Sequence, residues 1–211
     1  MENYNKYIEN KIYDMETNQS ILICGIGGQG VVLSGKIISL SAFYENYDVK
    51  TSEVHGMSQR GGSVSTHLRY GEKIFTPLIS MHSADIILSF DLYETIRYIG
   101  YAKKETKIIT ASEGKYIKGS SSNQIKLPSP KSIIDKIKID LNLKNLFAID
   151  IEKIALELGN IKVANTILIG VSSQFTYIKE HTWLSILKEN VPAKTTDINE
   201  KAFLLGRKML N

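Results

Sequence analysis

The stretch that decides the fold is Ser20-Ile-Leu-Ile-Cys-Gly-Ile-Gly-Gly-Gln-Gly30, a short apolar run that ends in glycines. Such a run followed by a glycine turn is typical of a buried parallel strand that leads into a helix. We expect this helix from about residue 31 to 44, where Val31, Val32, Ile38 and Phe43 lie among small residues that permit close packing on a sheet. Strand, glycine turn and helix form the first half of a βαβ unit.

The rest of the chain predicts further strands followed by helices. We expect strands over 49–54, 84–90, 107–110 and 145–149, a hairpin of 63–70 with 73–76, helices over 92–101 and 151–158, and irregular connections at 119–123 and 128–130. Asp91 and Glu94 suit a capping arrangement at the start of the 92–101 helix. Beyond residue 162 we expect helices over 163–174, 182–189 and 197–210. The predicted class is α/β, a Rossmann-like three-layer sandwich with a mostly parallel sheet and a helical C-terminal part.

Length and composition favour one domain with a small appendage. The chain has 211 residues, of which 43% are hydrophobic, and this is enough for one sizeable core over residues 20–211. Residues 1–19 form a polar N-terminal extension in which Tyr4, Ile8, Ile12 and Met15 recur at helical spacing, so a docking helix and a frayed tail are both open. No apolar run spans a bilayer and the first residues are not signal-like, so we expect a cytoplasmic protein.

Charge and cysteine usage exclude several functions. The net charge of +4 is not concentrated in one run, so a nucleic-acid surface is not expected, although an anionic small ligand remains open. Cys24 is the only cysteine, which excludes an intrachain disulfide and an iron–sulfur cluster built on four thiolates. Because Cys24 lies inside an apolar strand, we expect a buried, inert thiol. The four histidines show no metal-ligand spacing, and no Gly-x-Ser-x-Gly or Gly-Asp-Gly triplet occurs, so the sequence offers little basis for catalysis by this chain alone.

The glycine loop is the first candidate binding site, formed by Gly25, Gly27, Gly28, Gln29 and Gly30. Glycines at this spacing permit a tight turn at a helix N-terminus, where amide hydrogens and the helix dipole favour an anion. A dinucleotide would also require an acidic residue about 20 positions further on, and Glu53 is a candidate. A stand-alone dinucleotide-dependent oxidoreductase therefore stays an alternative. A P-loop is excluded because Ile37 stands where a magnesium-binding hydroxyl is needed.

The second candidate loop follows the second expected strand and contains Arg60, Gly61, Gly62 and Ser63. Because the carboxyl ends of parallel strands share one edge of a sheet, both loops should lie at that edge. Arg60 is one of only four arginines, and its planar guanidinium suits bidentate pairing with a phosphate or carboxylate. A structural ion pair with Glu53 is the alternative.

Four stretches together resemble the gamma domain of 2-oxoacid:ferredoxin oxidoreductases. They are Gly25-Ile-Gly-Gly-Gln-Gly30, Glu53-Val-His-Gly-Met-Ser-Gln-Arg-Gly-Gly-Ser63, Ala164-Asn-Thr-Ile-Leu-Ile-Gly170 and Asn199-Glu-Lys-Ala-Phe-Leu-Leu-Gly206. The resemblance runs from about residue 21 to 210, in the family's order, and is greatest to the branch that acts on arylpyruvates such as indolepyruvate. Pyruvate and 2-oxoglutarate enzymes belong to the same family.

The resemblance implies a subunit of a larger enzyme that is not catalytically complete by itself. In that family a 2-oxoacid is oxidatively decarboxylated with coenzyme A, and electrons pass to ferredoxin. Thiamine diphosphate and iron–sulfur clusters are then expected on a large partner subunit, with coenzyme A or a subunit contact at the two loops. This division agrees with the single cysteine and the missing thiamine motif.

Overall fold

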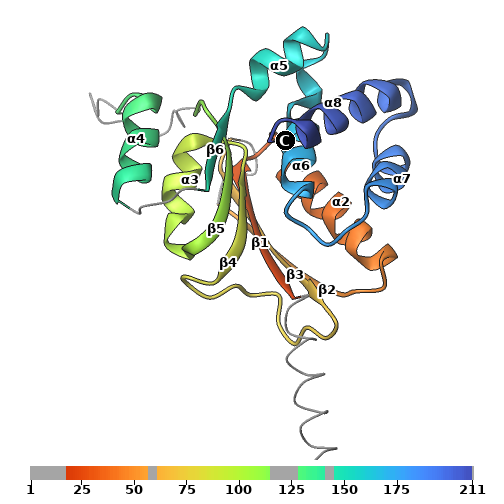
Figure 1. Ribbon diagram of the computed structural model, residues 1–211, viewed down its shortest axis with the longest axis horizontal. Helices are drawn as coiled ribbons and strands as arrows, with labels where there is room; N and C mark the ends of the chain where they lie inside the picture. Colours follow the sequence, from red (N-terminus) through yellow and green to blue (C-terminus); the bar gives the residue numbers. More distant parts are fainter. Residues whose placement is uncertain (1–17, 57–60, 115–127, 141–144, 211) are drawn as a thin grey trace, which may run out of the picture.

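The protein is an α/β sandwich with a six-stranded sheet between two layers of helices, as the computed structural model in Figure 1 shows. The structure describes residues 18–56, 61–114, 128–140 and 145–210. The strands are β1 (Gln19–Ile26), β2 (Asp48–His55), β3 (Ser63–Gly71), β4 (Ala84–Ser89), β5 (Ala102–Ala111) and β6 (Leu146–Ile149). The α-helices are α2 (Val31–Tyr44), α3 (Leu92–Tyr98), α4 (Pro130–Asp140), α5 (Ile151–Glu157), α6 (Ala164–Ser173), α7 (Glu180–Asn190) and α8 (Thr196–Lys208), with short 3₁₀ turns at 99–101, 161–163 and 193–195.

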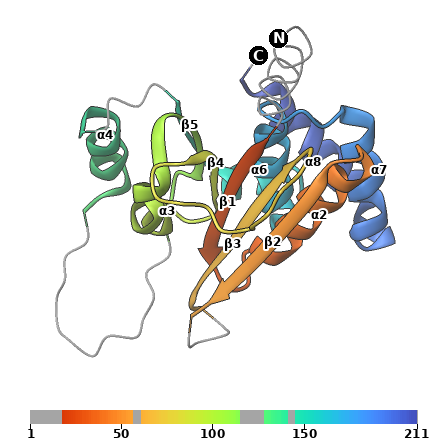
Figure 2. The ribbon, with the colours of Figure 1, turned by 90° about the horizontal axis from the view of Figure 1, so that it is seen from below.

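The sheet has the strand order β2-β3-β1-β4-β5-β6. β1, β4, β5 and β6 pair in parallel, whereas β3 is antiparallel to both of its neighbours, β1 and β2. Of the strands in the described ranges, β3 alone therefore runs in the opposite direction, and Figure 2 shows β2 at the outer edge beyond it. The expected three-layer α/β fold with a mostly parallel sheet and a helical C-terminal part is confirmed.

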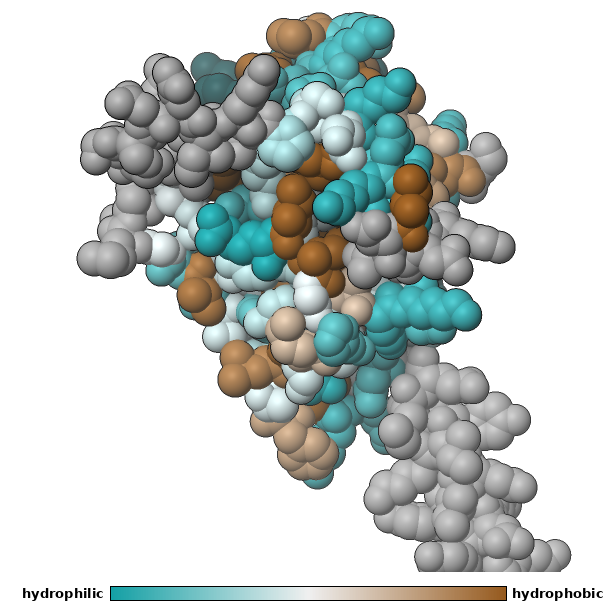
Figure 3. Space-filling model, turned by 90° about the vertical axis from the view of Figure 1, so that its left-hand side faces the viewer, coloured by the Kyte–Doolittle hydropathy of each residue, from teal (hydrophilic) through white to brown (hydrophobic). Residues whose placement is uncertain are grey.

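Alternation along β1 divides the core between the two faces of the sheet. Ile21 and Ile23 belong to the cluster that packs against α2, α6, α7 and α8. Leu22 and Cys24 point the other way and join the cluster under α3 and α4. All four side chains are at most 1% exposed, because a central parallel strand is covered on both faces. Figure 3 shows one face of the molecule, the left-hand side of Figure 1, where apolar residues lie among polar ones.

The predicted hairpin of 63–70 with 73–76 is wrong. Residues 63–71 do form β3, but its partners are β1 and β2, so both of its edges are already occupied. Residues 73–76 have no edge left to pair with and form an irregular connection instead, in which the amide of Ile74 donates to Asp48 Oδ2 at 2.9 Å. Local alternation could not reveal that β2, which precedes β3 in the chain, would take this edge.

Other sequence expectations need smaller corrections. Pro128 and Pro130 indicate an irregular connection, yet the structure has helix α4 there, and Pro130 occupies its first position, where a missing amide hydrogen costs nothing. The strand expected over 107–110 begins five residues earlier. The 119–123 connection lies outside the described residues, as does the N-terminal extension up to residue 17. No helix in the described ranges is long and apolar enough to cross a membrane.

Candidate functional site

The candidate site lies where the direction of the sheet connections changes. From β1 the chain turns through α2 toward β2 and β3, whereas from β4 it turns through α3 toward β5 on the other side. In open α/β sheets, ligands bind beyond the carboxyl ends of the strands at such a switch point. The glycine loop after β1 and Phe90 after β4 meet there, and the amide of Phe90 donates to the carbonyl of Cys24 at 2.9 Å.

A cavity of about 700 Å³ opens at this edge of the sheet. Its volume is within the usual range for small-molecule sites. It extends from the glycine loop to the ends of β5 and β6 and to the N-termini of α5 and α6. The lining residues are Gly28, Gln29, Gly30, Leu33, Phe90, Ala111, Ser112, Glu113, Gly114, Ile149, Asp150, Ile151, Glu152, Ile161, Lys162, Ala164 and Asn165.

The predicted loop residues divide into cavity residues and supporting residues. Gly28, Gln29 and Gly30 line the cavity, but Gly25 and Gly27 do not. A Cβ on Gly25 would lie 2.9 Å from Gln29 Oε1, so this glycine makes room for the loop itself. The amide of Gly27 donates to the carbonyl of Gly62 at 2.8 Å. Gln29 closes the turn, because its Oε1 accepts from the amide of Ile26 at 2.7 Å.

Gly30 determines how closely the opposite wall can approach. Its φ of 88° is in the left-handed region, and it is the N-cap of α2. A Cβ at this position would lie 2.5 Å from Asn165 Nδ2 on α6. The side-chain amide of Asn165 therefore lies directly against the glycine loop, next to the N-terminus of α2. The backbone amides of the first turn of a helix have no intrahelical acceptor. This arrangement places hydrogen-bond donors of two helices around one end of the cavity.

The second loop is described only in part. Arg60 lies outside the described residues, as do residues 57–59, so its predicted role at a ligand remains a prediction. Gly61 has a φ of 75°, and Gly62 is buried against the glycine loop through the Gly27 hydrogen bond. The Ser63 hydroxyl donates to the carboxylate of Glu94 rather than lining the cavity. The two loops thus meet at one edge of the sheet, as expected, and are bonded to each other.

Glu53 is not in a position to bind the ribose of a dinucleotide at the glycine loop. Such a residue belongs at the end of the strand beside β1, but antiparallel β3 lies between β1 and β2. This separates Glu53 from β1 by two strand spacings, about 10 Å. Its carboxylate instead contacts Nε2 of His55 on the same strand at 3.3 Å. The topology therefore argues against the stand-alone dinucleotide enzyme.

Cys24 is the buried, inert thiol that the sequence indicated. Its side chain has no exposure, and burial raises its pKa to about 12, against a smaller lowering by the Ser89 hydrogen bond. Within the described ranges no group of three or more His, Cys, Asp or Glu side chains could hold a metal ion. A thiol of this kind offers neither a nucleophile nor a ligand at neutral pH.

Sequence reasoning missed the polar residues that complete the cavity. Asn165 supplies a donor beside the glycine loop, Lys162 adds a cationic side chain to the cavity lining, and Glu113, Asp150 and Glu152 add carboxylates. Asp150 is also the N-cap of α5, since its Oδ1 accepts from the amide of Lys153 at 3.1 Å. Asn165 stood within a stretch recognised by resemblance, but only the packing of α6 brings it to the loop. The cavity lining therefore contains one cationic side chain, one amide and three carboxylates.

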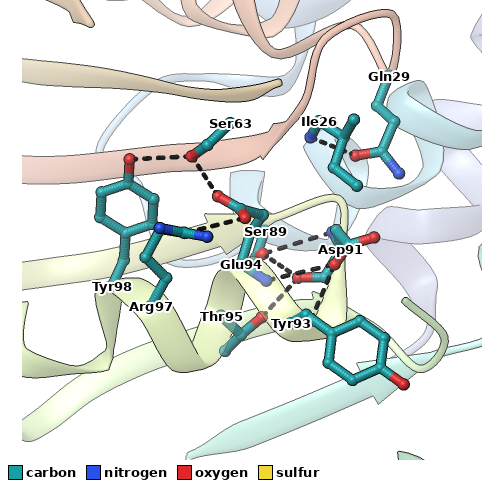
Figure 4. A network of polar contacts seen from close by, with 10 residues as sticks. All are labelled: Ile26, Gln29, Ser63, Ser89, Asp91, Tyr93, Glu94, Thr95, Arg97 and Tyr98. Atoms are coloured by element: carbon teal, nitrogen blue, oxygen red, sulfur yellow. Dashed lines mark hydrogen bonds and ion pairs between the residues drawn. The ribbon is translucent and has the colours of Figure 1, made fainter. Parts of the chain in front are cut away.

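A second polar cluster lies beneath the loops, around the N-terminus of α3 (Figure 4). Asp91 caps this helix as predicted, because its Oδ1 accepts from the amides of Tyr93 and Glu94 at 2.9 and 3.3 Å. The Glu94 carboxylate does not take part in the predicted cap. It accepts from Ser63 and from Nε of Arg97, the latter at 3.1 Å. Glu94 is only 2% exposed, so its carboxylate is buried, whereas the Arg97 side chain is 58% exposed.

Comparison with known proteins gives one consistent family. A family model described as pyruvate ferredoxin/flavodoxin oxidoreductase matches residues 20–209. The chain is 37% identical over 199 residues to the indolepyruvate oxidoreductase subunit IorB of Pyrococcus horikoshii, covering 91% of this chain and 98% of the relative.

Solved structures of low sequence identity share the fold. The gamma subunit of a keto/oxoacid ferredoxin oxidoreductase from Geobacter sulfurreducens is 20% identical with a TM-score of 0.65, covering 89% of this chain and 95% of that one. The 2-oxoglutarate:ferredoxin oxidoreductase of Magnetococcus marinus, solved with 2-oxoglutarate, coenzyme A and succinyl-CoA, is 19% identical with a TM-score of 0.66. The match covers 90% of this chain and 30% of that one.

Proposed function

The chain belongs to the pyruvate ferredoxin/flavodoxin oxidoreductase family, and from this premise we propose that it is the small, non-thiamine subunit of an indolepyruvate:ferredoxin oxidoreductase. The observation that carries the proposal is the likeness to the Pyrococcus horikoshii subunit, which extends over nearly the whole of both chains. The reaction is the coenzyme A-dependent oxidative decarboxylation of an arylpyruvate to an aryl-acetyl-coenzyme A, with electrons passed to ferredoxin.

The proposal assigns the redox chemistry to a large partner subunit. That partner carries thiamine diphosphate and the iron–sulfur clusters and delivers electrons to ferredoxin. The support from this chain is its single cysteine, because a cluster usually requires four thiolates and Cys24 is buried with a raised pKa. A lone unpaired cysteine also suits the reducing cytoplasm, where we place the complex.

The cavity beside the glycine loop is the proposed position of a coenzyme A phosphate. The amide of Asn165 supplies a donor there, Lys162 lines the same cavity, and the first turn of α2 adds backbone amides and a partial positive charge. This chain's residues would bind and orient coenzyme A while the partner supplies the thiamine chemistry. Arg60 of the second loop would bind the same phosphate. Should the loops serve subunit contact alone, variants there would change assembly and not coenzyme A affinity.

The first experiment tests the subunit role. The chain is co-purified with its large subunit, and coenzyme A-dependent ferredoxin reduction is measured with indolepyruvate, pyruvate and 2-oxoglutarate. We expect turnover by the complex, with preference for indolepyruvate, and none by this chain alone. Full activity of the large subunit without this chain would contradict the proposal.

The second experiment tests the ligand site with a matched pair of lysine variants. Lys162 lines the cavity, whereas Lys153 is an exposed lysine of α5 outside it. Lys162→Ala should raise the KM for coenzyme A about fivefold, since an exposed charge pair contributes about 1 kcal/mol. Lys153→Ala should leave that KM unchanged. Equal effects of the two substitutions would remove the argument for a phosphate at this end of the cavity.

A further inference from the structure

The base of the second loop is tied to the glycine loop by backbone hydrogen bonds. The amide of Gly56 donates to the carbonyl of Ser63 at 2.9 Å and closes the loop where it leaves and enters the sheet. The adjacent carbonyl of Gly62 accepts from Gly27 at 2.8 Å. Any displacement of Ser63 therefore moves Gly62, and with it the glycine loop that lines the cavity.

Ser63 is held in turn by the carboxylate of Glu94. The Ser63 hydroxyl donates to Glu94 Oε2 and lies 3.3 Å from the hydroxyl of Tyr98. Glu94 Oε1 accepts from Arg97 Nε at 3.1 Å, and Figure 4 shows these side chains converging on Ser63 from α3. Both carboxylate oxygens thus have a partner, and one of those partners, Ser63, belongs to the second loop.

Stability alone does not explain a carboxylate at this position. Glu94 is 2% exposed, and removing a charge from water is costly even when it is paired. The Arg97 side chain that pairs with it is 58% exposed, so solvent screens much of the attraction. An apolar side chain of similar size would often serve a fold equally well. A directional acceptor for Ser63, by contrast, requires an oxygen.

We propose that Glu94 is a positioning residue, which holds the spacing of the two loops through Ser63 and thereby sets the affinity of the assembled enzyme for coenzyme A. The inference rests on the proposed function, since it takes coenzyme A to bind beside the glycine loop. Glu94 itself lies outside the cavity lining and does not contact the ligand. Its influence passes through Ser63, Gly62 and Gly27.

The test is a set of variants in the complete two-subunit enzyme. Glu94→Leu removes the acceptor at similar volume, Ser63→Ala removes the donor, and Glu94→Gln keeps an acceptor oxygen without the charge. Glu94→Leu should raise the KM for coenzyme A about tenfold, with kcat and the KM for indolepyruvate within about twofold of the wild type. Ser63→Ala should raise the KM for coenzyme A by a similar factor. The double variant Ser63→Ala/Glu94→Leu should raise it little further than either single variant. Glu94→Gln should retain most of the wild-type affinity for coenzyme A.

The control is Asp85, a carboxylate near the amino-terminal end of β4, away from the glycine loop, that also joins separate elements. It accepts from the amide of Ser20 at 2.8 Å and pairs with Lys103 at 2.5 Å. Asp85→Asn should lower thermal stability without changing the KM for coenzyme A. An unchanged KM for coenzyme A in Ser63→Ala would overturn the inference. So would an equal rise of that KM in Asp85→Asn. If Glu94→Leu does not assemble with the large subunit, the result for Ser63→Ala is decisive.

Failure of the proposed function has a different result. If Lys162→Ala and the Glu94 variants all leave the KM for coenzyme A unchanged, the ligand is not at this cavity. If Lys162→Ala raises it while Glu94→Leu and Ser63→Ala do not, the cavity binds the ligand and only the positioning role is refuted.

Discussion

From the close contact between α6 and α8 we predict that Gly170→Ala destabilises the fold. A Cβ on Gly170 would lie 2.1 Å from the carbonyl oxygen of Phe203 and 3.1 Å from the amide nitrogen of Arg207. The relation is reciprocal, since a Cβ on Gly206 would lie 2.1 Å from the carbonyl oxygen of Ile167. These glycines end two of the stretches that resemble the family, and the structure gives them a packing role: they let two helix backbones touch.

The cost of Gly170→Ala follows from this geometry. The atoms that clash are backbone and cannot rotate away, so the helices must separate by about 1 Å, and overpacking of this kind costs up to roughly 3 kcal/mol. Alanine recovers about 1 kcal/mol through its helix propensity. The free energy of unfolding should therefore fall by about 2 kcal/mol, which corresponds to a Tm lower by roughly 4 to 8 °C in a chain of this size.

The chain contains its own reporter for this measurement. Trp183, the only tryptophan, is fully buried on α7 with its ring centroid 5.9 Å from that of Phe203. Urea unfolding followed by its fluorescence reports directly on the packing of α8. Gly35→Ala is the matched control, because the atoms nearest to a Cβ there belong to side chains that can shift, the closest being Thr66 Cγ2 at 3.1 Å. Equal stability of Gly170→Ala and Gly35→Ala would refute the reasoning.

Two further predictions concern buried titratable groups. Because burial raises the pKa of Cys24 to about 12, the native chain at about pH 8 should react with a thiol reagent only as fast as it unfolds, and rapidly in denaturant; fast labelling of the native state would contradict its burial. Burial lowers the pKa of His67 from its usual 6.5, and its Nδ1 accepts from the amide of Ile79 at 3.1 Å. Its neutral form therefore contributes stability that is present above about pH 6.5 and is lost as the pH falls below that value. His67→Asn, which keeps an acceptor without titrating, should flatten this part of the urea-midpoint profile between about pH 7 and 5, and an unchanged slope would contradict the assignment.

The first half of the βαβ unit could be read from the sequence because its signals are local. The apolar run of β1, the glycines after it and the small residues of α2 follow one another along a single short stretch. Each of these local patterns is typical of the element that forms there. The single cysteine and the missing thiamine triplet likewise could be read without a structure, and they agree with the partner subunit that the family resemblance implies. The resemblance of four separate stretches extended this to a family, which the comparisons confirmed.

The misplaced hairpin shows where local reading fails. The alternation of 63–71 identified a strand correctly, but which edges it would pair with depended on β1, far earlier in the chain, and on β2. The same long-range pairing moved Glu53 two strands away from the glycine loop and so removed the ribose ligand of the dinucleotide alternative. Strand order is a property of the whole sheet, so it cannot be predicted from a short local segment of the sequence.

By itself, the sequence determined the α/β class and the glycine turn at a helix N-terminus, because each depends on residue types and spacing along the chain. Only the tertiary structure decided which side chains share the cavity. Asn165 of α6 lies against Gly30 of the glycine loop, Lys162 lines the same cavity, and the Ser63 hydroxyl at the start of β3 donates to Glu94 of α3. Those contacts join residues that are far apart in the sequence, and such residues come together only when the chain folds.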